Sequence, residues 1–219
     1  MSKHNHAVAS PFVEKLDVDG RHLFFTADTH FCHTNIIRYC NRPFESVEEM
    51  NETLIANWNR VVGPDDTVYH LGDFGMGTAL GSNGEPQTLA DIAYRLNGQI
   101  HLIIGNHDLR PLTDSNYCSR FASLRYQAIL EIGQQTIILN HYPMLCYAGA
   151  YDKKGLTWQF FGHVHSGPLQ SMPDPPAYDL PRLKNLFDTQ YDVGVDNNGF
   201  APVSLESIRL VMSTRSQRT

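Results

Sequence analysis

Five apolar, strand-like runs of the chain each end in polar residues of the types that bind metal ions. The runs cover residues 23–26, 68–71, 100–104, 137–140 and 158–161. The polar residues after them are Asp28 and His30, then Asp73, then Asn106 to Asp108, then His141, and finally His163 and His165. In α/β folds the carboxyl ends of strands are where binding and catalysis are concentrated. We therefore expect one shared polar site, assembled from strand ends that are distant in the sequence.

Helical patterns separate some of these runs. Ser46 and Glu49 have the spacing of a capping box, and apolar residues through Val61 then recur at i, i+3 and i+4. An amphipathic helix is expected over 88–96, where Asn97-Gly98 ends it. Thr34 is placed to cap a short helix over 34–40. The first half of the chain thus alternates strands with helices.

Further strands are expected in hairpins and near the end of the chain. One hairpin would join 12–19 to 22–26 through an Asp-Gly turn, and another would join 124–132 to 136–139 around Gly133. Residues 191–195 and 205–212 are expected to add two more strands. Early alternation followed by mostly strands predicts an α/β sandwich of two mixed sheets flanked by helices.

Length and composition indicate an ordinary globular protein. The 219 residues, 42% apolar and 18% charged, predict a single domain over 1–219, with a flexible tail at 1–10. A Gly-rich loop at 75–86 and a Pro-rich loop at 166–190 follow candidate ligands, and we expect one of them to border the substrate entrance. No apolar run approaches the roughly 20 residues of a membrane helix. The N-terminal residues lack the apolar segment of a signal peptide. The four cysteines form no C-x-x-C pair, which favours reduced thiols in a cytoplasmic protein.

The net charge of −6 bears on the kind of partner. It counts against a protein that mainly coats nucleic acid, because such proteins neutralise phosphates with lysine and arginine. It does not count against a phosphate-bearing substrate, since bound divalent cations reverse the local field.

The motifs, in order, are Asp-x-His, Gly-Asp, Gly-Asn-His-Asp, a His two residues before a Pro, and Gly-His-x-His. Together they resemble the calcineurin-like metallophosphoesterase family over residues 24–165, and more loosely at 194–196. The first motif runs from Asp28 to Asn35 and is followed by Arg42-Pro43-Phe44, which is similar to the small stand-alone bacterial and phage members. The resemblance implies a four-layer αββα sandwich of two mixed β-sheets.

The resemblance also implies two divalent metal ions. Asp28, His30 and His165 would hold the first ion. Asn106, His141 and His163 would hold the second, and Asp73 would bridge the two. Imidazole and carboxylate ligands suit Mn, which we expect, or Fe, Zn, Co or Ni. His163 and His165 would point to opposite faces of a regular strand, so both reach metal only if the chain breaks at Gly162.

In the same family the His of Gly-Asn-His-Asp faces the leaving group, which makes His107 the expected catalytic group. Asp108 would hydrogen-bond its imidazole and favour the charged form. Weaker candidates for substrate contacts are His33, Asn35, Arg38 and Arg42.

These features predict a metal-dependent phosphoric ester hydrolase. A hydroxide bridging the metals would attack a small phosphodiester or phosphomonoester. A nuclease or nucleotide pyrophosphohydrolase of the same fold is the alternative within the enzyme class, although the acidic balance makes nucleic acid the less favoured partner. From other classes, a catalytically silent scaffold for protein contacts and a purely structural metal protein remain open. The oligomeric state is left open as well.

Overall fold

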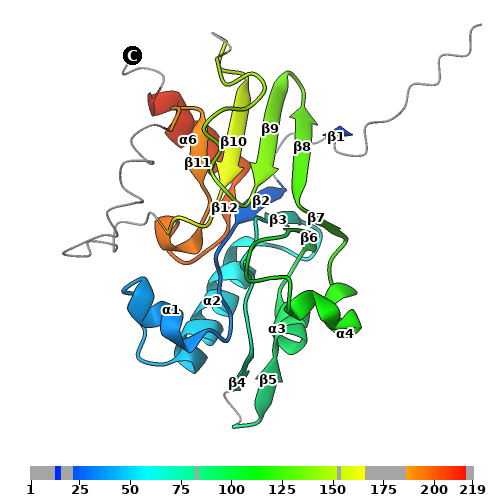
Figure 1. Ribbon diagram of the computed structural model, residues 1–219, viewed down its shortest axis with the longest axis vertical. Helices are drawn as coiled ribbons and strands as arrows, with labels where there is room; N and C mark the ends of the chain where they lie inside the picture. The colour runs from blue at the N-terminus through cyan, green and yellow to red at the C-terminus, as the bar shows by residue number, and fades with distance from the viewer. Residues whose placement is uncertain (1–12, 16–21, 82–83, 152–153, 166–185, 216–219) are drawn as a thin grey trace, which may run out of the picture.

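The computed structural model describes residues 13–15, 22–81, 84–151, 154–165 and 186–215 (Figure 1). Two five-stranded mixed sheets form its centre. Sheet 1 has the order β12 (Val203–Ser204), β2 (Leu23–Thr26), β3 (Thr67–His70), β6 (Gln99–Ile103), β7 (Ser123–Arg125). Sheet 2 has the order β1 (Val13–Lys15), β8 (Gln127–Ile132), β9 (Gln135–Asn140), β10 (Thr157–Phe161), β11 (Gln190–Asp192).

Helices flank the sheets, and in Figure 1 sheet 1 lies between sheet 2 and helices α1–α4. A small antiparallel hairpin lies at the same end of the molecule as these helices. The helices are α1 (Thr34–Tyr39), α2 (Val47–Val61), α3 (Leu89–Arg95), α4 (Ser115–Cys118) and α6 (Leu205–Arg215). The hairpin strands are β4 (Thr78–Leu80) and β5 (Pro86–Thr88), and short 3-10 turns cover η1 (Pro111–Thr113) and η2 (Val195–Asn197). The predicted fold class is confirmed.

Alternation along the strands divides the core into two parts. On β2, Phe24 packs with the helices in one apolar cluster, which includes Met50 and Trp58 of α2. Its neighbour Phe25 belongs to the second cluster, which joins sheet 1 to sheet 2 through residues such as Phe160. Successive side chains of a strand point to opposite faces, so sheet 1 is covered on both sides. The strand ends are therefore held in fixed positions.

The predicted N-terminal hairpin is wrong. β1 pairs in parallel with β8 of sheet 2 and not with β2. β2 already has β3 on one edge and β12 on the other, so it offers no free edge to β1. The turn expected between the two strands, residues 16–21, lies outside the described residues.

The strand predicted at 205–212 is also wrong, because this segment is helix α6. Its buried side chains are Leu205, Ile208 and Met212, which lie at helical spacing, whereas Leu210 is exposed. The strand predicted at 191–195 is shorter than expected, since β11 ends at Asp192 and η2 begins at Val195.

The other elements follow the predicted patterns more closely. β8 and β9 form the hairpin expected around Gly133, but the run at 124–132 is divided, with its start in β7 of sheet 1. Ser46 caps α2 by accepting the Glu49 N–H, while the complete capping box is that of Thr88 and Asp91 in α3. The N-cap of α1 is His33 and not Thr34.

The structure describes most of one of the two predicted loops but little of the other. The Gly-rich segment contains β4 and ends at Pro86, the first residue of β5. Most of the Pro-rich segment, residues 166–185, lies outside the described residues, as does the tail at 1–10. Among the described helices, none has the length and apolar character that crossing a membrane requires.

Candidate metal centre

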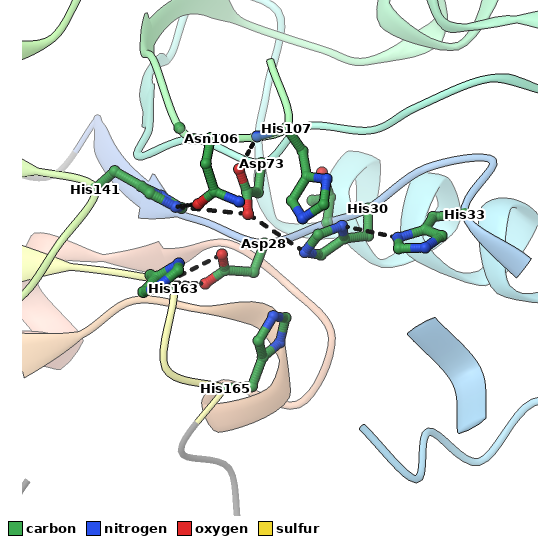
Figure 2. A network of polar contacts seen from close by, with 12 residues as sticks. Asp28, His30, His33, Asp73, Asn106, His107, His141, His163 and His165 are labelled. Carbon is green, nitrogen blue, oxygen red and sulfur yellow. Dashed lines mark hydrogen bonds and ion pairs between the residues drawn. The ribbon is translucent and has the colours of Figure 1, made fainter. Parts of the chain in front are cut away.

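The polar residues at the five strand ends come together at one place, where the two sheets meet (Figure 2). In this view their side chains point toward one another. Sheet 1 supplies residues that follow β2, β3 and β6, and sheet 2 supplies residues that follow β9 and β10. The converging candidate ligands are Asp28, His30, Asp73, Asn106, His141, His163 and His165.

Among the described residues, four groups of three side chains have the spacing of metal ligands, and two of these groups consist entirely of predicted ligands. One consists of Asp28, His30 and His165, and the other of Asp73, His141 and His163, with donor atoms within 4.8 Å of one another in each group. Metal–ligand bonds of about 2.1 Å place neighbouring donor atoms about 3 Å apart. The donor spacing therefore suits a shared cation in each group.

Asp73 belongs to the second group and also approaches His30 of the first. Its Oδ2 is 3.6 Å from His30 Nε2 and 3.5 Å from His141 Nε2. Its Oδ1 accepts the His107 backbone N–H at 2.8 Å. Asn106 Oδ1 lies 3.1 Å from the same His141 Nε2. Asp73 thus has the position of a carboxylate shared by two cations.

Strained backbone brings many of these side chains into the centre. Five candidate ligands have positive φ angles: Asp28 (57°), His30 (50°), Asp73 (56°), His163 (72°) and His165 (49°). For residues other than glycine this conformation costs about 1 kcal/mol or more each, and such residues gather at functional sites. The chain leaves its strand after Phe161, and this break brings His163 and His165 into the same centre.

Gly162 makes that break possible. A Cβ at this position would lie 2.6 Å from Asp28 Oδ2, closer than any real contact allows. The absence of a side chain also lets the His163 backbone N–H reach the Asp28 carboxylate, at 2.8 and 3.0 Å. The glycine therefore joins the end of β10 to the end of β2.

Burial leaves the centre with charges and donors that a cation would satisfy. Burial raises the pKa of the Asp28 carboxyl to about 7. Burial also lowers the pKa of His30 well below its usual range, and nearby cationic groups add to this effect. The Nε2 atom of His30 is buried and has no hydrogen-bond partner among the described residues. Buried polar atoms are normally paired, so this unpaired nitrogen fits a metal ligand.

The sequence comparison then identifies the family. A model of calcineurin-like phosphoesterases matches residues 22–167. The chain belongs to this family. The predicted family is thereby confirmed, and membership implies phosphoester hydrolysis with divalent metal ions.

Similarity to other proteins extends over most of the chain. It is 34% identical over 200 residues to the uncharacterized protein MJ1445 of Methanocaldococcus jannaschii, covering 91% of this chain and 96% of that protein. It is 30% identical to the Gene 66 protein of Mycobacterium phage L5, and the match covers 79% of this chain and 86% of the phage protein. The chain also resembles a solved structure, that of the protein of unknown function AQ665 from Aquifex aeolicus, with 25% sequence identity and a TM-score of 0.62. The match covers 86% of this chain and 98% of AQ665.

A buried ion pair that the sequence analysis did not single out supports the calcineurin-like centre. Asp196 Oδ2 lies 2.7 Å from His165 Nδ1, and the Asp196 carboxylate accepts two bonds from Arg42 at 2.8 and 2.9 Å. A carboxylate on one ring nitrogen orients the imidazole and leaves Nε2 as the donor to metal. The sequence offered two signals: the looser resemblance at 194–196, and another strand end, because Asp196 comes shortly after β11 as the candidate ligands come shortly after their strands.

Arg42 also holds the backbone of the centre in place. Its remaining N–H groups donate to the backbone carbonyls of Thr29 and Asp28, at 2.9 and 2.6 Å. The guanidinium is fully buried. The prediction that Arg42 touches substrate is therefore wrong, since its donors hold the ligand-bearing backbone instead.

Asp196→Asn is expected to destabilise the fold by about 3–5 kcal/mol, because it leaves the buried Arg42 guanidinium without a counter-charge. Chemical unfolding of the metal-free protein measures this. Glu52→Gln is the matched control, because it breaks the exposed Arg95–Glu52 pair and should cost under about 1 kcal/mol. Equal effects of the two variants would contradict the assigned role of Asp196.

Asp108 has a different role from the one predicted. Its carboxylate accepts three backbone N–H groups, from Asp73 (2.8 Å), Phe74 (2.9 Å) and Gly105 (2.7 Å). Burial raises the pKa of this carboxyl, and the N–H donors oppose that effect. The prediction that Asp108 hydrogen-bonds the His107 imidazole is wrong, because both oxygens bind backbone. Asp108 instead ties the loop after β3 to the loop after β6.

The remaining predicted residues lie around the edge of the centre. The His107 ring is 5.1 Å from that of His30, and it also lies within reach of Asp73. His33 Nδ1 is 3.2 Å from His30 Nδ1. Asn35 and Arg38 are exposed on α1. Substrate contacts by His33, Asn35 and Arg38 stay predictions.

Proposed function

We propose that this phosphoesterase uses two divalent metal ions to hydrolyse a small phosphodiester or phosphomonoester. Both ions are expected to be Mn²⁺. The observation that carries the proposal is the position of Asp73, which belongs to one group of ligands and also approaches His30 of the other. One ion would be held by Asp28, His30 and His165. The other would be held by Asn106, His141 and His163, and Asp73 would bind both ions. When bound, the ions would supply positive charge to the phosphoryl oxygens and lower the pKa of a water molecule.

The residues of the chain would divide the remaining work. Asp73 and Asp28 bring two carboxylates to the centre, fewer negative charges than two dications would bring positive ones, so the loaded site would attract a phosphate ester. His107 borders the centre and would donate a proton to the oxygen of the departing alcohol, a step that a poor leaving group needs. Asp196 and Arg42 would hold His165 and the backbone at Asp28 in place.

Competing functions receive less support from the same features. A silent scaffold would not need a full set of converging donors, yet every candidate ligand lies in the centre. A purely structural metal protein would close each ion within four ligands of its own, and a shared Asp73 does not fit that arrangement. A nuclease of the same fold stays less favoured because of the net charge of −6.

Metal analysis of the purified protein is expected to find about two ions per chain after Mn²⁺ loading. Chelation should abolish hydrolysis of bis(4-nitrophenyl) phosphate or 4-nitrophenyl phosphate, and Mn²⁺ should restore it. A panel of mono- and diesters that includes cyclic nucleotides would then define the substrate. One ion or none in active protein would contradict the two-metal proposal.

A further inference from the structure

A cavity of about 590 Å³ opens beside the candidate metal centre. Three parts of the chain enclose it: the turn before α1, the β4–β5 hairpin with the start of α3, and residues 107–117 after β6. In Figure 1 the hairpin, α3 and α4 lie together at this end of the molecule. His33 and His107 line the cavity and also lie in the ring cluster at the centre (Figure 2).

The volume of the cavity indicates the size of ligand that it can hold. Pockets of about 300–1,000 Å³ enclose most of a drug-sized organic molecule. A phosphoryl group at the metal centre, with His107 on the side of its leaving oxygen, would extend its alcohol toward this space. The cavity thus suits a compact alcohol better than a nucleic-acid duplex.

The walls of the cavity combine apolar surface with one permanently charged cation. Met76, Leu89 and Pro111 provide apolar surface. The acidic wall residue, Asp114, already accepts the backbone N–H groups of Asn116 and Tyr117 as the N-cap of α4.

Arg110 is that cation. Its guanidinium makes no hydrogen bond or ion pair with any residue that the structure describes, unlike the guanidiniums of Arg42, Arg95 and Arg120. A guanidinium presents a planar fork of donors that matches a carboxylate or phosphate. An anionic group on the ligand would give Arg110 the partner that the protein itself does not supply.

We propose that this cavity binds the alcohol portion of the phosphate ester, and that Arg110 makes the enzyme prefer an alcohol that carries a second negative charge. The inference rests on the proposed function. In the reaction, water adds its oxygen to phosphorus, the bond from phosphorus to the alcohol oxygen breaks, and that oxygen takes a proton. The products are the anionic alcohol and the remaining phosphate.

Two matched diesters test the preference: methyl 4-(carboxymethyl)phenyl phosphate and methyl 4-(carbamoylmethyl)phenyl phosphate. They have the same shape, and the methylene group keeps the leaving oxygen nearly the same in both. The Mn²⁺-loaded wild type is expected to show about a tenfold higher kcat/KM for the carboxylate, mainly through KM. Arg110→Gln should bring the ratio close to one, and Arg110→Lys should retain part of it.

Arg60→Gln is the control, because Arg60 is an exposed arginine in the last turn of α2 and does not line the cavity. It should keep the tenfold ratio. An active wild type with a ratio near one would overturn the role of Arg110 and leave the proposed function intact. If the Mn²⁺-loaded wild type hydrolyses neither of the two esters and no ester of the broader panel, both the role of Arg110 and the proposed function are overturned. A ratio that survives Arg110→Gln would place the anion recognition elsewhere and contradict the assignment.

Discussion

Asp73→Asn is expected to lower phosphoester hydrolysis by about a thousandfold or more and to reduce the metal content of the purified protein. The substitution removes one negative charge from the point where both groups of ligands meet, 3.6 Å from His30 Nε2 and 3.5 Å from His141 Nε2. Asparagine still offers an oxygen to the His107 backbone N–H. The loop geometry is thus preserved while the bridging charge is lost, so the effect isolates metal binding.

Metal analysis and single-turnover assays on the same preparations measure this effect. Asp65→Asn is the charge-matched control, because Asp65 is exposed in the loop before β3 and should leave both quantities unchanged. Circular dichroism separates loss of metal from loss of fold. An Asp73→Asn protein with full metal content and full activity would exclude Asp73 as the bridging ligand.

His107→Ala is expected to keep both metal ions and to lower kcat by about 10²–10⁴-fold on an alkyl phosphodiester. On a 4-nitrophenyl ester the loss should be much smaller, because 4-nitrophenolate leaves without needing a proton. The imidazole borders the centre, with its ring 5.1 Å from that of His30 and 5.8 Å from that of His33. The dependence on the leaving group distinguishes proton donation from a general disturbance of the site.

Metal content decides between two roles for this histidine, because His107 also forms a possible ligand group with His30 and Asp73. A His107→Ala protein that loses an ion would make it a ligand and contradict the proposed proton donor. An equal loss of rate on both esters would contradict it as well. His22→Ala serves as the control, since His22 pairs with Asp66 away from the centre and should change neither readout.

The strand-end pattern could be predicted from the sequence because it depends on local rules. Each apolar run marks a strand, and parallel strands collect their carboxyl ends at one edge, so residues such as Asp28 and Asp73 were predictable neighbours. The same reasoning explains why Gly162 was expected to break its strand. Helix α2 was predictable for an equally local reason, namely a cap followed by one apolar face.

The failures of prediction share a cause, which is dependence on distant partners. β1 carries a strand pattern, but its partner depended on which sheet edge stayed open, and that edge belongs to β8. Arg42 follows the first motif, yet its role depends on Asp196, which lies 154 positions away. Asp108 likewise adjoins His107 in the chain but binds backbone of the loop after β3. Adjacency in a motif did not reveal which groups these side chains contact.

The candidate ligands come from both sheets, and this has a mechanical consequence. Asp28 and His30 follow a strand of sheet 1, while His165 follows a strand of sheet 2, so a single ion in this group would be held by both. The group of Asp73, His141 and His163 combines the two sheets in the same way. Each ion would therefore act as a cross-link between the two halves of the sandwich, and acquiring metal would tighten the architecture in the same event that prepares it for chemistry.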